Sequence, residues 1–434
     1  MYSATSRALI DILHAEVKPA LGCTEPGAVA LAATRARELL NEEVETCEIF
    51  VSSNIYKNGM GVGIPGTDQV GLLAAACMGI TGGESSLGLS ALESVDTSSM
   101  KEALKLIQSG IVNIRVHDTI DKIYIEVCMR GHSNTAKVII NGRHDQFVHI
   151  SRNDEVFLHV DLDYGVEVVS HSVLAELTIK ELIQEIETLN HEDICFMLEG
   201  LNMNKQICLV GLRNRVGAGV GYSMQKALEE GMIGDDVINK AIIMTSAASD
   251  ARMSGAKLPV MSSNGSGNHG LTAILPIAAY DEKFPQSDER LAKALAISHL
   301  VTAYIKNYTG RLSAVCGCGV AASTGSAAGI AWLMNLNYKQ IEGAILNMIG
   351  NLSGMICDGA KAGCAYKLAS AAGAAIQSAL YVKYGSVIPS LNGIIGSTVE
   401  ESIRNLGIVS DKGMTITDKV IVEVMDSSHC KMMN

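Results

Sequence analysis

Residues 312–338 contain no charged side chain. A stretch of this length can span a lipid bilayer, so it must be buried either in a membrane or inside a protein. Its polar residues are Ser313, Ser323, Thr324, Ser326, Asn335 and Asn337, and it also holds two cysteines. Because so many polar groups are costly in lipid, and because the segment begins with a Gly-Cys-Gly loop, the pattern favours a buried helix over a membrane span.

The core around this segment is predicted to consist of closely packed helices. Hydrophobic residues make up 48% of the chain, yet it has one Trp and five Phe. From residue 214 onward, long segments of Ala, Gly, Ile and Met alternate with glycine-rich loops, including residues 216–221 and 262–270. The C-terminal part is therefore expected to be mainly helical.

The N-terminal part has a mixed pattern. Residues 6–15 predict a short helix, and a second helix is expected from Thr24, which can cap it, to Leu40. Residues 47–52 read as a strand, and a glycine-rich loop at 59–66 leads to an apolar helix from Gln69. Short β-type runs separated by polar turns fill residues 111–161 and predict an antiparallel series of hairpins.

These patterns predict an α+β fold with two parts. Residues 1–200 would form an α/β N-terminal part with the strand-rich segment, and residues 201–434 a helical part rich in Gly and Ala. No repeat of fixed period and no low-complexity linker separates them, so the boundary is soft.

Charge and composition limit the functions open to the chain. The net charge is −12 and no block of Lys or Arg occurs, which argues against binding to nucleic acid or to an anionic membrane. The first twenty residues lack the apolar stretch of a signal peptide, so we expect a cytoplasmic protein that acts on a small molecule. The apolar Ala/Gly helices weakly suggest a homo-oligomer.

Four of the eleven cysteines are grouped within 49 residues, at Cys316, Cys318, Cys357 and Cys364. Each lies among Gly and Ala, and soft thiolates with small neighbours suit an iron–sulfur cluster. Zinc competes for such ligands, but no C-x2-C pair supports a structural zinc site. The cysteines that stand alone in apolar runs are expected to be core residues: Cys47, Cys77, Cys128, Cys195 and Cys208.

Two glycine-rich loops are further candidates for binding. The loop at 59–66 lacks the Gly-Lys-Ser/Thr of a phosphate loop, so nucleotide binding is not favoured. Free backbone N–H groups in the loop at 262–270 could bind a carboxylate, with side chains from Asn264, Ser266, Asn268 and His269. The alternative is an ordinary tight loop.

Four motifs in order along the chain carry a family resemblance. They are Glu16-Val-Lys-Pro-Ala-Leu-Gly-Cys-Thr-Glu-Pro26, Asn264-Gly-Ser-Gly-Asn-His-Gly270, the segment 316–329 beginning Cys-Gly-Cys-Gly, and Met355-Ile-Cys-Asp-Gly-Ala-Lys-Ala-Gly-Cys364. Together they resemble the L-cysteine desulfidase family, which is related to the helical α domain of iron–sulfur L-serine dehydratases. The resemblance extends over almost the whole chain.

The resemblance implies an oxygen-sensitive [4Fe–4S] cluster held by three cysteines, with one iron open to the substrate. Carried over by position, the ligands are Cys357, Cys364 and either Cys316 or Cys318, and the spacing in the dehydratase relatives favours Cys316. It also implies that Cys23 acts as a base, which suits a thiol at the positive end of a helix. The alternatives for Cys23 are an iron ligand or a loop cysteine without function.

The implied function is an iron–sulfur lyase that eliminates sulfide from L-cysteine to give pyruvate and ammonia, without pyridoxal phosphate. An L-serine dehydratase with the same cluster chemistry is the nearest alternative, because the two substrates differ in one leaving atom. A non-catalytic iron–sulfur sensor is a second alternative.

Overall fold

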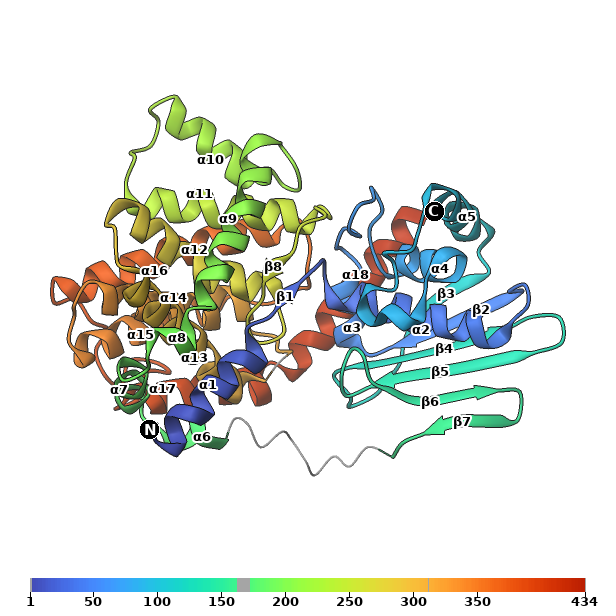
Figure 1. Cartoon of the computed structure of the whole chain (residues 1–434), viewed down its shortest axis with the longest axis horizontal. Helices are drawn as coiled ribbons and strands as arrows, with labels where there is room; N and C mark the ends of the chain where they lie inside the picture. The colour runs from blue at the N-terminus through green and yellow to red at the C-terminus, as the bar shows by residue number, and fades with distance from the viewer. Residues whose placement is uncertain (1, 162–171, 311, 434) are drawn as a thin grey trace. The chain divides into compact units, whose positions relative to one another are not determined.

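A computed structural model describes residues 2–161, 172–310 and 312–433 of the chain (Figure 1). The fold is α+β, as predicted, and divides into two compact units. The helical unit comprises residues 1–21, 168–357 and 362–415, and the sheet unit comprises residues 22–167, 358–361 and 416–434. Residues 172–200, grouped above with the N-terminal part, cluster with the helical unit.

The sheet unit contains a six-stranded sheet in the order β3-β2-β4-β5-β6-β7. Its strands are β2 (Thr46–Val51), β3 (Val112–Val116), β4 (Tyr124–Arg130), β5 (Thr135–Asn141), β6 (Phe147–Arg152) and β7 (Glu155–His159). Its helices are α2 (Thr24–Leu40), α3 (Ser53–Gly59), α4 (Leu72–Gly82), the 3-10 turn η1 (Ser85–Ser90), α5 (Thr97–Ser109) and the greater part of α18 (Thr415–Met433).

One face of this sheet forms the core of the unit. Along β4, Ile125, Val127 and Met129 are buried and alternate with less buried residues, as a sheet with one covered face requires. Helices α2 and α4 contact each other, and α2 also contacts β4 and β5 (Figure 1). The covering helices are rich in Ala, which lets them lie close to the strands.

The predicted hairpin series is confirmed for β4 to β7, which pair antiparallel. The prediction was wrong for β3, which pairs parallel with β2. A parallel pair needs a crossover connection, and here the chain between the two strands contains α3, α4 and α5. Residues 53–59 form α3, a helix that the sequence pattern did not indicate.

The C-terminal helix α18 is tied to α3 inside the sheet unit. Lys57 Nζ lies 2.5 Å from Asp418 Oδ1, and the side chain of Lys57 is only 2% exposed. The Tyr56 hydroxyl donates to Asp426 Oδ1 at 3.3 Å. A buried ammonium needs such a partner, so this pair fixes where α18 lies on the unit.

The helical unit is built from helices and one short two-stranded sheet. Its elements are α1 (Ala4–Glu16), β1 (Pro19–Ala20), α6 (Ser172–Glu176), α7 (Ile179–Glu187), α8 (His191–Ile194), α9 (Met197–Arg213), α10 (Val220–Glu229), α11 (Val237–Met253), β8 (Val260–Met261), α12 (Gly267–Lys283), α13 (Asp288–Thr309), the π-helix η3 (Gly317–Ala322), α14 (Ser323–Leu333), α15 (Tyr338–Leu352), α16 (Cys364–Lys383), α17 (Val399–Ile408) and the π-helix η4 (Val409–Gly413). Strands β1 and β8 pair antiparallel.

Three helices of this unit meet around Ala247 of α11. A Cβ added to Gly211 of α9 would lie 2.0 Å from the Ala247 carbonyl oxygen. A Cβ on Gly221 of α10 would lie 2.4 Å from Ala247 Cα. These helices therefore touch backbone to backbone, which only glycine permits.

The uncharged segment is buried in this unit. It forms η3 and α14, and ten of the eleven residues of α14 are buried. Among the described residues, no helix is both long and apolar enough to cross a membrane. The expectation of a buried helix is confirmed.

The loop at 216–221 has a structural role. The carboxylate of Asp250 accepts hydrogen bonds from the backbone N–H groups of Ala218, Gly219 and Gly221 at 2.9–3.1 Å. Asp250 is completely buried, and burial raises the pKa of its carboxyl while these bonds oppose that shift. The loop thus caps α10 with a side chain from α11.

His299 is a buried histidine on α13. Its Nδ1 lies 2.9 Å from the Ser263 hydroxyl, and the residue is 2% exposed. Burial lowers the pKa of His299 to about 3. At neutral pH its imidazole is therefore uncharged.

Replacing Gly211 by Ala is expected to lower the free energy of unfolding. The new Cβ would overlap the Ala247 carbonyl oxygen, and overpacking of this kind costs about 1–3 kcal/mol. Urea unfolding measures the change. Gly354→Ala is the matched control, because a Cβ there meets nothing within 4 Å. Equal stability of the two variants would contradict the close approach of α9 and α11.

His299→Gln is expected to make stability less sensitive to acid. The unfolded chain has the ordinary histidine pKa of about 6.5, so it binds more protons than the folded chain as the pH falls towards 3. The stability that the neutral His299 contributes is complete above pH 6.5 and is lost progressively as the pH falls below that value. Urea unfolding at pH 7.5 and 5.5 should show that the free energy of unfolding falls less for the variant than for the wild type. His132→Gln is the control, since that side chain is 91% exposed, and a loss equal to the wild type's would refute the assignment.

Candidate active site

Backbone pairing brings the two cysteine segments of the helical unit together. Cys316 N–H donates to the Met355 carbonyl at 2.8 Å, and Cys357 N–H donates to the Ala314 carbonyl at 2.7 Å. The two bonds form an isolated antiparallel bridge between the segments. Cysteines separated by about forty residues in sequence thus become neighbours.

The thiols of Cys316 and Cys318 are in contact. Their Sγ atoms lie 3.6 Å apart, and Gly319 N–H donates to Cys316 Sγ at 3.4 Å. The hydrogen bond with Cys318 and then burial raise the pKa of the Cys316 thiol, while an interaction with the Cys357 thiol lowers it. The side chains of three of the four grouped cysteines therefore interact.

Cys364 is the first residue of α16 and is 6% exposed. Its position at a helix N-terminus favours a thiolate. Among the residues that the structure describes, no group of three or more His, Cys, Asp or Glu side chains has the arrangement of a metal site. The assignment of cluster ligands therefore stays a prediction.

The donor set and its surroundings fit an iron–sulfur cluster. Thiolates are the ligands that such clusters use. Gly317 lies between the first two cysteines, Gly319 follows them, and neither position has room for a side chain. A Cβ on Gly319 would lie 2.1 Å from Met355 Sδ. A Cβ on Gly317 would lie 2.3 Å from His269 Nε2. Glycine here lets His269 and Met355 lie directly against the backbone of the first cysteine segment.

The predicted substrate-binding residues surround the N-terminus of α12. Asn264 adopts a left-handed conformation with φ 49°, and its Nδ2 donates to the Ser263 hydroxyl at 2.9 Å. Ser266 is the N-cap of α12, although its side chain makes no capping bond. Asn268 accepts from Arg252 Nη1 at 3.0 Å. The amide side chains of Asn264 and Asn268 thus already have protein partners.

His269 is the third residue of α12, within its first turn, and is 7% exposed. Its Nδ1 lies 3.1 Å from the Ser263 carbonyl oxygen. Burial lowers the pKa of His269 to about 3, and the charge of Lys306 adds to the effect. The ring is therefore neutral, with its Nε2 directed at Gly317 in the first cysteine segment.

Sequence reasoning missed two cations beside this loop. Arg252 of α11 and Lys306 of α13 are each 5% exposed, and both lower the pKa of His269. A Cβ on Gly267 would lie 2.4 Å from Arg252 Nε. The signal for Lys306 was present, because residues 294–305 contain no Asp, Glu, Lys or Arg and a lone lysine ends that run.

Cys23 belongs to the sheet unit and starts α2. Helix α2 spans Thr24–Leu40 as predicted, but Cys23 and not Thr24 is its N-cap, and the Cys23 side chain makes no capping bond. Cys23 Sγ instead donates to Glu25 Oε2 at 2.7 Å. Asn58 Nδ2 donates to the other carboxylate oxygen of Glu25 at 3.2 Å.

This contact modifies the expectation of a thiolate at Cys23. The helix N-terminus favours the thiolate, whereas a carboxylate that accepts the thiol hydrogen favours the protonated form. The side chain of Glu25 is buried, which strengthens the second effect. Glu25 and Asn58 are thus partners of Cys23 that sequence reasoning missed, although Glu25 lies in the same motif.

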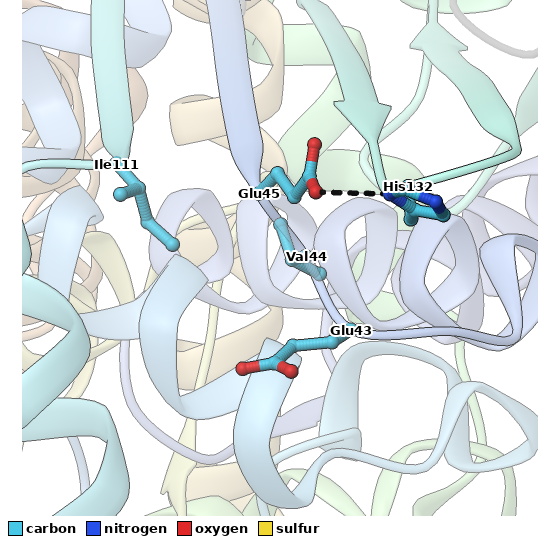
Figure 2. A pocket seen from close by; sticks show the side chains of 5 residues that line it. All are labelled: Glu43, Val44, Glu45, Ile111 and His132. Carbon is cyan, nitrogen blue, oxygen red and sulfur yellow. Dashed lines mark ion pairs between the residues drawn. The ribbon is translucent and has the colours of Figure 1, made fainter.

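A pocket of about 450 Å³ in the sheet unit contains none of these residues. Figure 2 shows its lining residues, which are Glu43, Val44, Glu45, Ile111 and His132. His132 Nδ1 lies 3.8 Å from Glu45 Oε1, and both side chains are exposed. An exposed pair of this kind is weak, and the pocket offers no other reactive arrangement.

Comparison with known proteins gives a family for this chain. Residues 87–423 match the family model described as serine dehydratase alpha chain. A UPF0597 protein of Clostridioides difficile is 58% identical over 96% of this chain and 99% of its own length. A UPF0597 protein of Alkaliphilus metalliredigens is 50% identical over 96% and 94%, and one of Bacteroides fragilis is 40% identical over 99% and 100%.

The match extends from the first turn after α4 into α18, so it includes the cysteine segments and the loop before α12. It confirms the relation to serine dehydratases that the four motifs implied. The chain therefore belongs to the serine dehydratase alpha chain family.

Proposed function

We propose that this protein is an iron–sulfur lyase that eliminates sulfide from L-cysteine to form pyruvate and ammonia in the cytoplasm. The observation that carries the proposal is the backbone pairing of the two cysteine segments, together with the interaction between the thiols of Cys316, Cys318 and Cys357. Membership of a serine dehydratase family supports a β-elimination of this type. The four motifs together resemble the L-cysteine desulfidase family, and this resemblance is the ground for proposing cysteine as the substrate.

Cys357, Cys364 and Cys316 would hold a [4Fe–4S] cluster, with Cys318 as the alternative to Cys316. When bound, the cluster supplies a Lewis acid that makes sulfide a better leaving group. The interacting thiols must lose their protons to bind metal, so cluster assembly releases protons and depends on pH.

Cys23 would remove the α-proton of the substrate. Its own proton goes first to Glu25 Oε2, which already accepts the thiol hydrogen. The thiolate then takes the α-proton, and the electron pair of the C–H bond forms the C=C bond. The electron pair of the C–S bond leaves with sulfide as HS⁻. The proton held by Glu25 returns to the departing HS⁻ through solvent, and the aminoacrylate tautomerises and hydrolyses to pyruvate and ammonia.

The loop before α12 would bind the substrate. Asn264, Ser266, Asn268 and His269 lie at a helix N-terminus, where N–H groups and the dipole favour a carboxylate. The side chain of Ser266 makes no capping bond, which leaves the first turn of α12 without a side-chain cap.

L-Serine is the second candidate substrate, and the family description favours it. A hydroxyl leaves less readily than a thiol, so the assistance of a Lewis acid matters more for serine. The same residues would serve both reactions. Turnover of the two amino acids therefore has to be compared directly.

Protein purified without oxygen is expected to contain about four irons and about four sulfides per chain and to release sulfide from L-cysteine. Iron and sulfide analysis with a pyruvate assay on both amino acids measures this. Cys357→Ser should lose the iron, whereas Cys195→Ser, at an exposed cysteine outside the group, should keep it. Iron-free protein that resists reconstitution would refute the cluster, and much more efficient turnover of L-serine would refute the desulfidase assignment.

Cys23→Ala is expected to retain iron and to lose turnover by about 10²- to 10⁴-fold, the usual contribution of a general base. Iron content and kcat for L-cysteine are measured on the same preparation, again with Cys195→Ser as control. Full turnover would exclude Cys23 as the base. Loss of iron together with turnover would instead make Cys23 a ligand.

A further inference from the structure

Two histidines lie opposite each other on neighbouring strands of the sheet unit. His149 of β6 pairs with His159 of β7, the strand at the edge of the six-stranded sheet (Figure 1). At the next register position, Val160 N–H donates to the Val148 carbonyl at 2.8 Å. His149 and His159 are therefore a non-hydrogen-bonded pair, the kind of antiparallel pair whose side chains approach each other most closely.

Both histidines project from the face of the sheet that the helices leave uncovered. Val148 and Ile150, which flank His149 in β6, are each 7% exposed and belong to the core. Side chains alternate between the two faces along a strand, so His149 and its partner point away from that core. The side chain of His159 is 63% exposed. An ion bound between the two rings would therefore have room for water ligands.

The two rings face each other through the same nitrogen. His149 Nδ1 lies 3.4 Å from His159 Nδ1, and the ring planes are inclined by 81°. This separation is long for a hydrogen bond. It matches the distance between two nitrogen ligands of one tetrahedral ion, which is about 3.3–3.4 Å for metal–nitrogen bonds of about 2.0–2.1 Å. The rings thus have the spacing of a chelating pair.

The outer nitrogen of each ring has a partner. His159 Nε2 lies 3.3 Å from Asp161 Oδ1, and a carboxylate only accepts, so the neutral ring carries its proton on Nε2 and a lone pair on Nδ1. His149 Nε2 lies 3.0 Å from the Ser151 hydroxyl, which can donate or accept. His149 can therefore place its proton on Nε2 and free its own Nδ1 without losing a hydrogen bond. Metal-binding histidines use their second nitrogen in this way.

The charges around the pair permit the binding of a cation. Burial lowers the pKa of His149, and Lys137 and His159 act in the same direction, whereas Glu126 opposes them. The neutral imidazole is the form that binds metal. Lys137 Nζ is itself paired with Glu126 Oε1 at 3.1 Å, which offsets the lysine charge.

We propose that His149 and His159 bind a divalent transition-metal ion of the zinc class through their two Nδ1 atoms. Imidazole suits such ions, and the spacing suits tetrahedral coordination. Water completes the coordination, because the described residues contain no group of three His, Cys, Asp or Glu side chains that could hold a metal. The ion links the edge strand β7 to β6. The site belongs to the sheet unit and is independent of the proposed lyase activity.

Hydrogen exchange of the full chain, with and without zinc chloride at pH 7.5, tests the proposal. Zinc should slow exchange of the β7 amides, because opening of β7 separates the two ligands. At a zinc concentration ten times the dissociation constant, this exchange should slow about tenfold. The readout is local, so zinc taken up by the grouped cysteines does not contribute to it.

His149→Gln and His159→Gln should each lose the effect of zinc on β7, since one imidazole alone cannot bridge the strands. His132→Gln, which removes an exposed histidine outside the pair, is the matched control and should keep the effect. Exchange of β4 and β5 without zinc shows that each variant is folded. Slowing by zinc that persists in both variants would overturn the proposal, and so would a wild-type protein whose β7 amides do not respond to zinc.

Discussion

Close approach of backbones at glycine is the constraint on which the helical unit depends. A Cβ on Gly325 of α14 would lie 2.2 Å from the carbonyl oxygen of Ser298, and one on Gly270 of α12 would lie 1.9 Å from that of Met261. Helices packed this tightly have few alternative positions, because interiors are as dense as molecular crystals. The close packing of α11, α12 and α13 positions Arg252, His269 and Lys306 near the loop before α12. The same property of glycine lets the side chains of His269 and Met355 lie against the backbone of the first cysteine segment.

The cost of burying charge shapes the chemistry of the candidate site. His269 avoids that cost by staying neutral, while the charges of Lys306 and Arg252 remain nearby. Cys316 avoids it as a protonated thiol, because a neighbouring thiol and burial raise its pKa. A thiophilic metal would reverse that preference by binding the thiolates. At Cys23 the helix dipole favours the thiolate, whereas the Glu25 carboxylate, which accepts the thiol hydrogen, favours the thiol.

Much of the fold followed from local patterns. The helix at 24–40, the strand at 47–52 and the hairpins of β4 to β7 are dictated by residues close in sequence. The parallel strand β3 was not predicted, because parallel pairing depends on a crossover and not on the pattern of the strand itself. The place of α18 depends on its ion pair with Lys57, from the other end of the chain.

For the candidate site, the sequence by itself determined the chemical inventory: four grouped cysteines, a glycine-rich loop with a histidine, and a cysteine before a helix. Residue type and spacing express such features directly, because thiol chemistry and helix starts are local. Only the tertiary structure decided that Cys316 and Cys357 are neighbours, that Gly317 lies under His269 and Lys306, and that Glu25 takes the hydrogen bond of Cys23. Those contacts depend on how separate segments pack and on which charges are buried together, which no local pattern encodes.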